Sequence, residues 1–169
     1  QLIFSPIPKP QKMSRFLSNG AIDKDSLPAQ KVKTVNRKKL CVKGIVVKKN
    51  TDIVFVTLVY RSYLDLYDFV KSIRDNVLCQ YQIVVVDAFF NEETSSLVEN
   101  CALELECDYI QVNNGGYGYG NNRGIDYVEE NYNYKHIAVC NPDTVLLRPI
   151  GLSVLESYRD CIAPEIVTR

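Results

Sequence analysis

Five glycines fall within the ten residues from Gly115 to Gly124, in the stretch Asn113-Asn-Gly-Gly-Tyr-Gly-Tyr-Gly-Asn-Asn-Arg-Gly124. Glycine lets the backbone take a positive φ and lets a ligand approach bare N–H groups. The apolar run 109–112 precedes the stretch, and a segment with helical spacing of apolar residues follows it. A glycine loop that opens a helix presents unpaired N–H groups and the positive end of the helix dipole. The stretch therefore predicts an anion-binding loop.

A carboxylate follows the next apolar run, in Asn141-Pro142-Asp143. Mg²⁺ or Mn²⁺ needs only one or two protein carboxylates when phosphates and waters complete its coordination. A divalent cation that bridges two phosphates neutralises the charge that grows when a sugar–diphosphate bond breaks. Asp143 is therefore the predicted metal ligand. The alternative is that these three residues form a plain turn, a common use of Asn, Pro and Asp.

Alternating apolar runs and helical patterns indicate the elements that position these residues. Strands are expected at 53–59, 82–86, 109–112 and 136–140, and a last strand at 161–167. Runs that are apolar on both faces are typical of parallel strands covered by helices on each side. Helices are expected after Ser62, after Asn91, after the glycine loop and at 152–158. The fold class predicted is α/β, an open and mostly parallel sheet with helices on both faces.

Polar residues follow three of the expected strands directly, namely Tyr60-Arg61, Asp87 and Asn141 to Asp143. Ligands in open parallel sheets bind at the carboxyl ends of the strands. Because these ends lie along one edge of the sheet, the three features are expected to converge on one site. His136, the sole histidine, precedes its strand and is expected at the surface without a catalytic role.

Composition divides the chain into two parts. Residues 1–50 hold 12 Lys and Arg against 2 Asp and Glu, whereas residues 51–169 hold 8 against 18. We expect a basic, irregular arm at 1–50, with one possible edge strand at 40–47, followed by the α/β domain at 51–169. The arm is interpreted either as a solvated linker that folds back on the acidic domain or as an attachment to anionic lipid, nucleic acid or an acidic partner.

Several classes of protein are disfavoured because the sequence lacks the motifs that are typical of them. The six cysteines form no Cys-x-x-Cys pair, which disfavours a zinc site or a disulfide framework and favours buried free thiols. No apolar run reaches the ~20 residues that span a bilayer. A lysine-bearing phosphate loop is absent, and Asn121 and Arg123 stand where a dinucleotide fingerprint needs its third glycine.

Together the motifs resemble the family 2 glycosyltransferases, which have the GT-A fold, and most closely their rhamnosyltransferase-like branch. The resemblance covers roughly residues 52–167, and its specific part is Asn-x-Gly-Gly-Tyr-Gly-x-Gly-Asn-Asn-x-Gly followed by Asn-Pro-Asp. It implies that Tyr60 stacks on the donor base, that Asp87 bonds the base or ribose, and that Asp143 takes the place of the last carboxylate of the family's Asp-x-Asp. The other donor-binding residues it implies are Gly115, Gly116, Asn122, Gly124 and Asn141.

The sequence departs from that family at two places. Arg61 stands where an Asn is common, and Asp87 is followed by Ala-Phe-Phe-Asn in place of Asp-Asn-x-Ser-x-Asp. The family's acceptor-deprotonating carboxylate lies well downstream of Asn-Pro-Asp, so the general base is expected beyond Arg169. Asp160 and Glu165 are not assigned this role. The expectation is a donor-binding part truncated at its C-terminus.

By resemblance, the expected activity is inverting transfer of a sugar from a nucleotide-diphosphate sugar to a hydroxyl of a saccharide or lipid-linked saccharide. The expected setting is cytoplasmic synthesis of a surface polysaccharide, with peripheral membrane contact through the basic arm and no nucleic-acid partner. One alternative is a module that binds nucleotide sugar without turnover. The other is a sugar nucleotidyltransferase, for which a glycine-rich loop with Arg and Lys would be needed where Tyr60-Arg61-Ser62 stands. The sugar, the base and the acceptor stay open.

Overall fold

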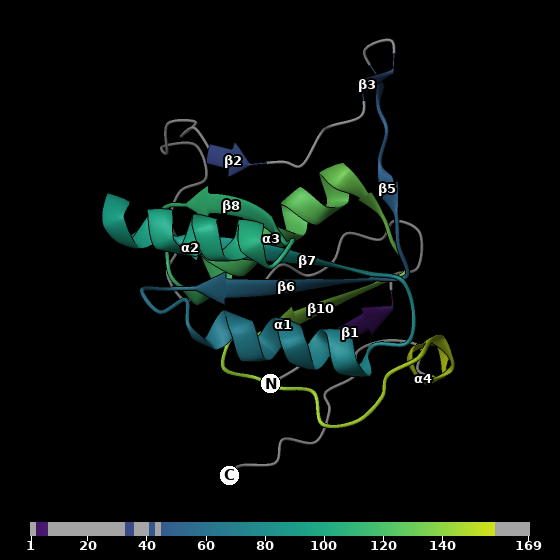
Figure 1. Ribbon diagram of the computed structural model, residues 1–169. Helices are drawn as coiled ribbons and strands as arrows, with labels where there is room; N and C mark the ends of the chain where they lie inside the picture. Colours follow the sequence, from purple (N-terminus) through teal and green to yellow (C-terminus); the bar gives the residue numbers. More distant parts are fainter. Residues whose placement is uncertain (1–2, 7–32, 36–40, 43–44, 158–169) are drawn as a thin grey trace.

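The computed structural model describes residues 3–6, 33–35, 41–42 and 45–157. These residues form a six-stranded central sheet (Figure 1). Its four inner strands are parallel and its two edge strands are antiparallel to their neighbours. In spatial order the strands are β1 (Ile3–Pro6), β10 (His136–Cys140), β6 (Ile53–Val59), β7 (Tyr81–Ala88), β8 (Asp108–Val112) and β2 (Lys33–Val35).

Helices cover both faces of this sheet. Helices α1 (Asp65–Asn76) and α2 (Glu92–Glu104) pack on one face, and α3 (Tyr117–Asn131) packs on the other (Figure 1). Side chains of a strand alternate between faces, so β6 sends Phe55 to the α1 and α2 core and Val56 to the α3 core. The predicted fold class, an open and mostly parallel α/β sheet with helices on both faces, is therefore confirmed.

Two segments of the expected arm join the sheet. β1 pairs with β10 and β2 pairs with β8, so the expectation of an irregular lead-in was wrong for these residues. The strand expected at 40–47 is instead a small hairpin of β3 (Cys41–Val42) and β4 (Ile45–Val46), outside the main sheet. Edge pairing depends on backbone hydrogen bonds, and short segments of mixed polarity carry no pattern that predicts it. β5 (Lys49–Asn50) pairs with β9 (Tyr132–Asn133).

The helix starts differ in how well the sequence predicts them. The Asn91 side chain accepts a hydrogen bond from the Thr94 N–H at 2.8 Å, as expected of the cap of α2. Ser62, after which a helix was expected, does not cap α1: its hydroxyl donates to the Asp65 carboxylate at 3.2 Å, and Leu64 occupies the cap position. The short helix expected at 152–158 is α4 (Leu152–Glu156).

The cysteines behave as expected where the structure describes them. Cys101, Cys107 and Cys140 are buried free thiols, and Cys79 is partly buried. Burial raises the pKa of Cys140, so its thiol stays protonated at neutral pH. Within the described ranges no helix is both long enough and apolar enough to cross a bilayer. The strand expected at 161–167 lies outside the described residues.

The glycine stretch is mostly helix rather than loop. α3 begins at Tyr117, directly after Gly116, whose φ of 88° suits glycine. A Cβ at Gly120 would lie 2.4 Å from Leu58 Cδ1, and one at Gly124 would lie 2.5 Å from Val56 Cγ1. The glycines inside the helix therefore let α3 approach β6 closely. Their four-residue spacing, which places them on one helical face, was the signal for this role.

We expect Gly124→Val to destabilise the fold by about 3 kcal/mol, because the side chain would overlap Val56 and Val86 in a packed core. Gly151→Val is the matched control, since the nearest atom to a Cβ there is Leu78 Cβ at 4.0 Å. The control should cost less than about 1 kcal/mol in urea unfolding. Equal losses in the two variants would contradict the close approach of α3 to the sheet.

His136 is buried at the start of β10, with only 4% of its surface exposed, so the expectation of a surface position was wrong. The strand is an inner strand of the sheet, and His136 stands opposite Pro6 of β1 and Ile53 of β6. Burial is the main cause that lowers the pKa of His136, while Glu156 acts in the opposite direction and Lys135 in the same direction.

A lowered pKa makes folding depend on pH. As pH falls through about 6.5, the unfolded chain binds a proton at His136 before the folded chain does, so stability decreases. We expect the free energy of unfolding to fall by at most about 1.4 kcal/mol per pH unit below that pH. Urea unfolding of the wild type and of His136→Asn between pH 7.5 and pH 5.5 checks this. An identical slope in both proteins would refute it.

Candidate functional site

The carboxyl ends of β10, β6, β7 and β8 lie along one edge of the sheet, where the arrowheads of β6 and β8 point in Figure 1. Four predicted features occur at this edge. Tyr60 follows β6, Asn141 to Asp143 follows β10, the glycine stretch follows β8, and Asp87 is the second-last residue of β7. The topology therefore places the predicted site residues at the same edge.

The turn after β10 carries the predicted metal ligand. The Thr144 N–H donates to the Asn141 carbonyl at 3.2 Å, so the interpretation of these residues as a turn is confirmed. This turn leaves the Asp143 side chain exposed to solvent. A turn and a binding role are compatible, because the backbone bond fixes the loop and leaves the carboxylate available for a ligand.

Tyr117, the first residue of α3, connects the glycine stretch to that turn. Burial is the main cause that raises the pKa of Tyr117 above its ordinary value; the nearby Asn121 amide lowers it, and Cys140 and Asp143 raise it further. The pKa of Tyr117 therefore includes contributions from Cys140 at the end of β10 and from Asp143 in the turn that follows. The first turn of α3 and Asp143 consequently belong to one neighbourhood.

Asn121 is a polar residue that the sequence analysis did not assign to the site. Its side chain is completely buried, one helical turn beyond Tyr117. Neither its Oδ1 nor its Nδ2 meets ordinary hydrogen-bond geometry with a described residue. Its position between Tyr117 and Gly124 on the inner side of α3 was the signal that could have identified it.

Asp87 differs from its predicted setting. β7 extends to Ala88, so Asp87 lies inside the strand with 1% of its surface exposed. The Tyr109 hydroxyl donates to Asp87 Oδ2 at 2.8 Å. The other oxygen, Oδ1, is buried and forms no hydrogen bond with the described residues. Because Oδ1 is buried, a hydrogen-bond donor of a ligand reaches it only if neighbouring side chains move.

An exposed cluster of Tyr60, Arg61 and Phe90 stands at the ends of β6 and β7. The rings of Tyr60 and Phe90 meet edge to face with centroids 6.0 Å apart, and the Arg61 guanidinium lies 4.3 Å from the Phe90 centroid. Arg61 has a φ of 72°, which is uncommon for a residue with a side chain. Phe90 was not predicted to take part, although Phe89-Phe90 directly after a strand was a signal.

The remaining predicted residues of the glycine stretch fall into two groups. Gly115 and Gly116 are exposed before the start of α3, with the Tyr119 ring beside Gly115. Asn122 is half-buried, and Gly124 is buried against Val56 and Val86. Thus the N-terminal glycines are open to a ligand, whereas Gly124 has a packing role in the sheet interface.

The opposite, amino edge of the sheet holds a polar cluster that the sequence analysis missed. Asp108, at the start of β8, is 6% exposed. The Tyr127 hydroxyl donates to Asp108 Oδ2 at 3.0 Å, the Tyr132 hydroxyl donates to the same oxygen, and Lys49 Nζ lies 3.5 Å from Oδ1. Both tyrosines are buried and pack against the sheet. The signal was an acidic residue directly before an apolar strand.

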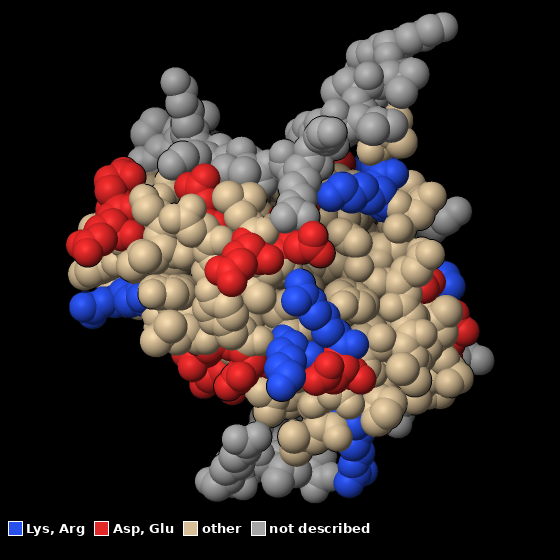
Figure 2. Space-filling view, viewed as in Figure 1, with Lys and Arg blue, Asp and Glu red and all other residues tan. Residues whose placement is uncertain are grey.

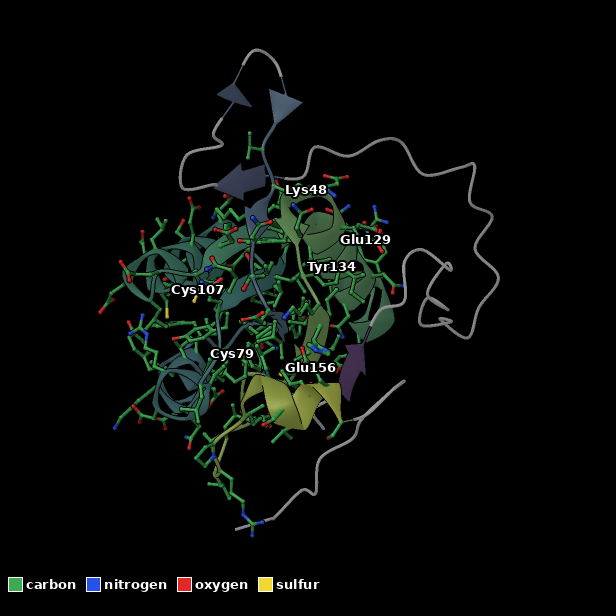
Figure 3. All side chains as sticks on the ribbon, turned by 90° about the vertical axis from the view of Figure 1, so that its right-hand side faces the viewer. Lys48, Cys79, Cys107, Glu129, Tyr134 and Glu156 are labelled. Atoms are coloured by element: carbon green, nitrogen blue, oxygen red, sulfur yellow. The ribbon has the colours of Figure 1, made fainter. Side chains whose placement is uncertain are left out.

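Figure 3 looks onto this amino edge, where the labelled Cys79, Cys107 and Tyr134 each precede a strand of the main sheet. Figure 2 shows acidic and basic side chains interspersed over the face formed by α1 and α2.

The basic residues expected to form the arm lie mostly outside the described part of the chain. Among the residues described, no group of three or more His, Cys, Asp or Glu is arranged to hold a metal ion.

No protein-family model matches the chain. A search of curated proteins likewise finds no significant match. Among solved structures, the chain is similar to S. aureus TarS with a TM-score of 0.48 and 15% sequence identity. The similarity covers 63% of this chain, which spans 19% of the TarS chain.

Removal of the Asp108 carboxylate should destabilise the fold. Asp108→Ala leaves two buried tyrosine hydroxyls without their acceptor, and we expect a loss of about 2–4 kcal/mol in urea unfolding. Asp143→Ala is the control, because that side chain is exposed and its loss should cost no more than about 0.5 kcal/mol. Similar stability of the two variants would show that the Asp108 cluster does not stabilise the amino edge.

Proposed function

We propose that this chain is the donor-binding part of a GT-A glycosyltransferase that takes a nucleotide-diphosphate sugar. One observation carries the proposal. The residues of the glycine motif and of Asn141-Pro-Asp143, read from the sequence as a family 2 signature, follow β8 and β10 at the same carboxyl edge of the sheet, and the charge of Asp143 contributes to the raised pKa of Tyr117. This edge is where ligands bind open parallel sheets.

The start of α3 suits the diphosphate. Gly115 and Gly116 are exposed, Gly116 has no side-chain cap, and the helix is fifteen residues long. Its first N–H groups and its dipole would stabilise negative charge on the phosphates. Tyr117 stays protonated because its pKa is raised, so its hydroxyl would donate a hydrogen bond to the leaving diphosphate.

Asp143 suits a divalent cation. Its carboxylate is exposed and makes no hydrogen bond or ion pair with the described residues, so it is available to an incoming ligand. A hard cation such as Mg²⁺ or Mn²⁺ accepts one carboxylate together with phosphate and water oxygens. When bound, the cation would supply positive charge to the phosphates. Asn141 would contribute an amide oxygen in the place of the family's first carboxylate.

The base would bind at the cluster of Tyr60, Arg61 and Phe90. Two aromatic rings and a guanidinium offer flat and polarisable surfaces on which a nucleotide base stacks. Asp87 would bond the base or ribose from beneath this cluster once the strand ends open. The half-buried Asn122 would lie beside the nucleotide, as its place in the motif suggests.

The finer parts of the proposal depend on the resemblance. They are membership of family 2 and its rhamnosyltransferase-like branch, inverting transfer to a saccharide hydroxyl, and a place in surface polysaccharide synthesis. Peripheral contact with a membrane through the basic arm also stays a prediction. Asp160 and Glu165 lie outside the described residues, so no general base is assigned. A module that binds nucleotide sugar without turnover is the competing proposal, and an assay for sugar transfer separates the two.

We expect metal to strengthen nucleotide binding only while Asp143 is intact. Calorimetric titration of UDP-, GDP- and dTDP-sugars with and without Mn²⁺ should show a metal-dependent gain of about tenfold or more in the wild type. Asp143→Ala should lose that gain and keep its metal-free affinity. Asp75→Ala is the control, since Asp75 is exposed in the last turn of α1 and should behave as the wild type. A metal-dependent gain that survives Asp143→Ala would remove Asp143 from the site.

A further inference from the structure

The hydrogen bond between Tyr109 and Asp87 uses one carboxylate oxygen and leaves the other without a described partner. Tyr109 is fully buried, and its hydroxyl donates to Asp87 Oδ2 at 2.8 Å. Burial raises the pKa of Tyr109, and the Asp87 carboxylate raises it further, so the phenol stays protonated and donates. Oδ1 of the same carboxylate is buried without a hydrogen bond to any described residue. Such an oxygen is costly unless something donates to it.

A second buried polar atom without a partner lies beside it. Gln111 stands opposite Asp87 in the register of β7 and β8, so the two side chains leave the sheet on the same face. Its Nε2 is buried and forms no hydrogen bond with the described residues. An acceptor and a donor therefore lie close together at the carboxyl edge, each with capacity for a further hydrogen bond.

Asp108, the buried carboxylate at the amino edge, is the comparison for Asp87, because its role is to stabilise the fold. Asp108 Oδ2 accepts from Tyr127 and Tyr132, and Oδ1 faces Lys49. Both of its oxygens are satisfied within the protein. Asp87 receives the same kind of tyrosine bond on one oxygen only. The difference between the two carboxylates indicates that a bound ligand donates the missing hydrogen bond to Asp87 Oδ1.

We propose that Tyr109 is a positioning residue of the donor site, an inference that rests on the proposed function. By occupying Oδ2, the Tyr109 hydroxyl fixes the rotation of the Asp87 carboxylate and leaves Oδ1 to accept an N–H of the nucleotide base. Tyr109 itself does not touch the nucleotide. Because Asp87 is only 1% exposed, the base reaches Oδ1 only after side chains at the carboxyl edge rearrange.

Tyr109→Phe removes the hydroxyl and keeps the ring. We expect it to weaken binding of the nucleoside diphosphate by about tenfold, because Asp87 loses its fixed orientation. Tyr127→Phe is the matched control, since it also removes a buried tyrosine bond to an aspartate, but at the amino edge. The control should bind within about twofold of the wild type. The measurement is calorimetric titration of the full chain with UDP, dTDP and GDP in Mn²⁺, using the one that the wild type binds most tightly.

A double variant tests whether Tyr109 acts through Asp87. If it does, Tyr109→Phe causes no further loss of affinity once Asp87→Asn is present, whereas independent effects multiply. Multiplied losses, or equal losses in Tyr109→Phe and Tyr127→Phe, would reduce Tyr109 to a structural residue. If Tyr109→Phe does not fold, Asp87→Asn alone decides, and unchanged affinity in it overturns the inference. Failure of the wild type to bind any of the three diphosphates would instead overturn the proposed function and this inference with it.

Discussion

The close approach of α3 to β6 is the constraint on which the candidate site depends. Gly120 and Gly124 have no side chain where one would overlap Leu58 and Val56, so the helix lies directly against the strand. The helix start is thereby held at the carboxyl edge, where the charge of Asp143, in the turn after β10, contributes to the raised pKa of Tyr117. A helix kept away by larger side chains would carry its N-terminus away from that turn. Packing inside the domain and the geometry of the site are thus linked by two glycines.

The parts of the fold that could be predicted from the sequence are those governed by burial. β6 is apolar on both faces because helices cover both, and this continuous run identified it as a central parallel strand. Asn91 was predictable as a cap since its oxygen has one favourable local partner. The placement of Asp143 and Tyr60 at one edge followed from topology alone, because parallel strands share their carboxyl ends.

The parts that could not be predicted depend on distant partners. The edge strands β1 and β2 are short, and their pairing uses backbone groups that leave no trace in the side-chain pattern. His136 is buried in an inner strand whose two partners, β1 and β6, come from distant parts of the chain. The glycine stretch was misassigned as a loop because glycine is compatible with both roles, and only its four-residue spacing distinguishes a helix face from a flexible loop.

The two buried aspartates show how one chain separates stability from binding. At the amino edge, Asp108 accepts hydrogen bonds from two tyrosines and pairs with a lysine. These interactions connect β8 to α3 and to β9. At the carboxyl edge, Asp87 has a single tyrosine bond, and Asn121 of α3, on the opposite face of the sheet, is buried without an ordinary hydrogen bond to a described residue. Leaving buried polar groups incompletely paired costs stability, and a fold tolerates that cost where a ligand completes the pairing. His136 at the amino edge also has buried ring nitrogens without a described partner, but Asp87, Gln111 and Asn121 all lie toward the carboxyl edge. This concentration is an argument for a binding site there that does not depend on any sequence motif.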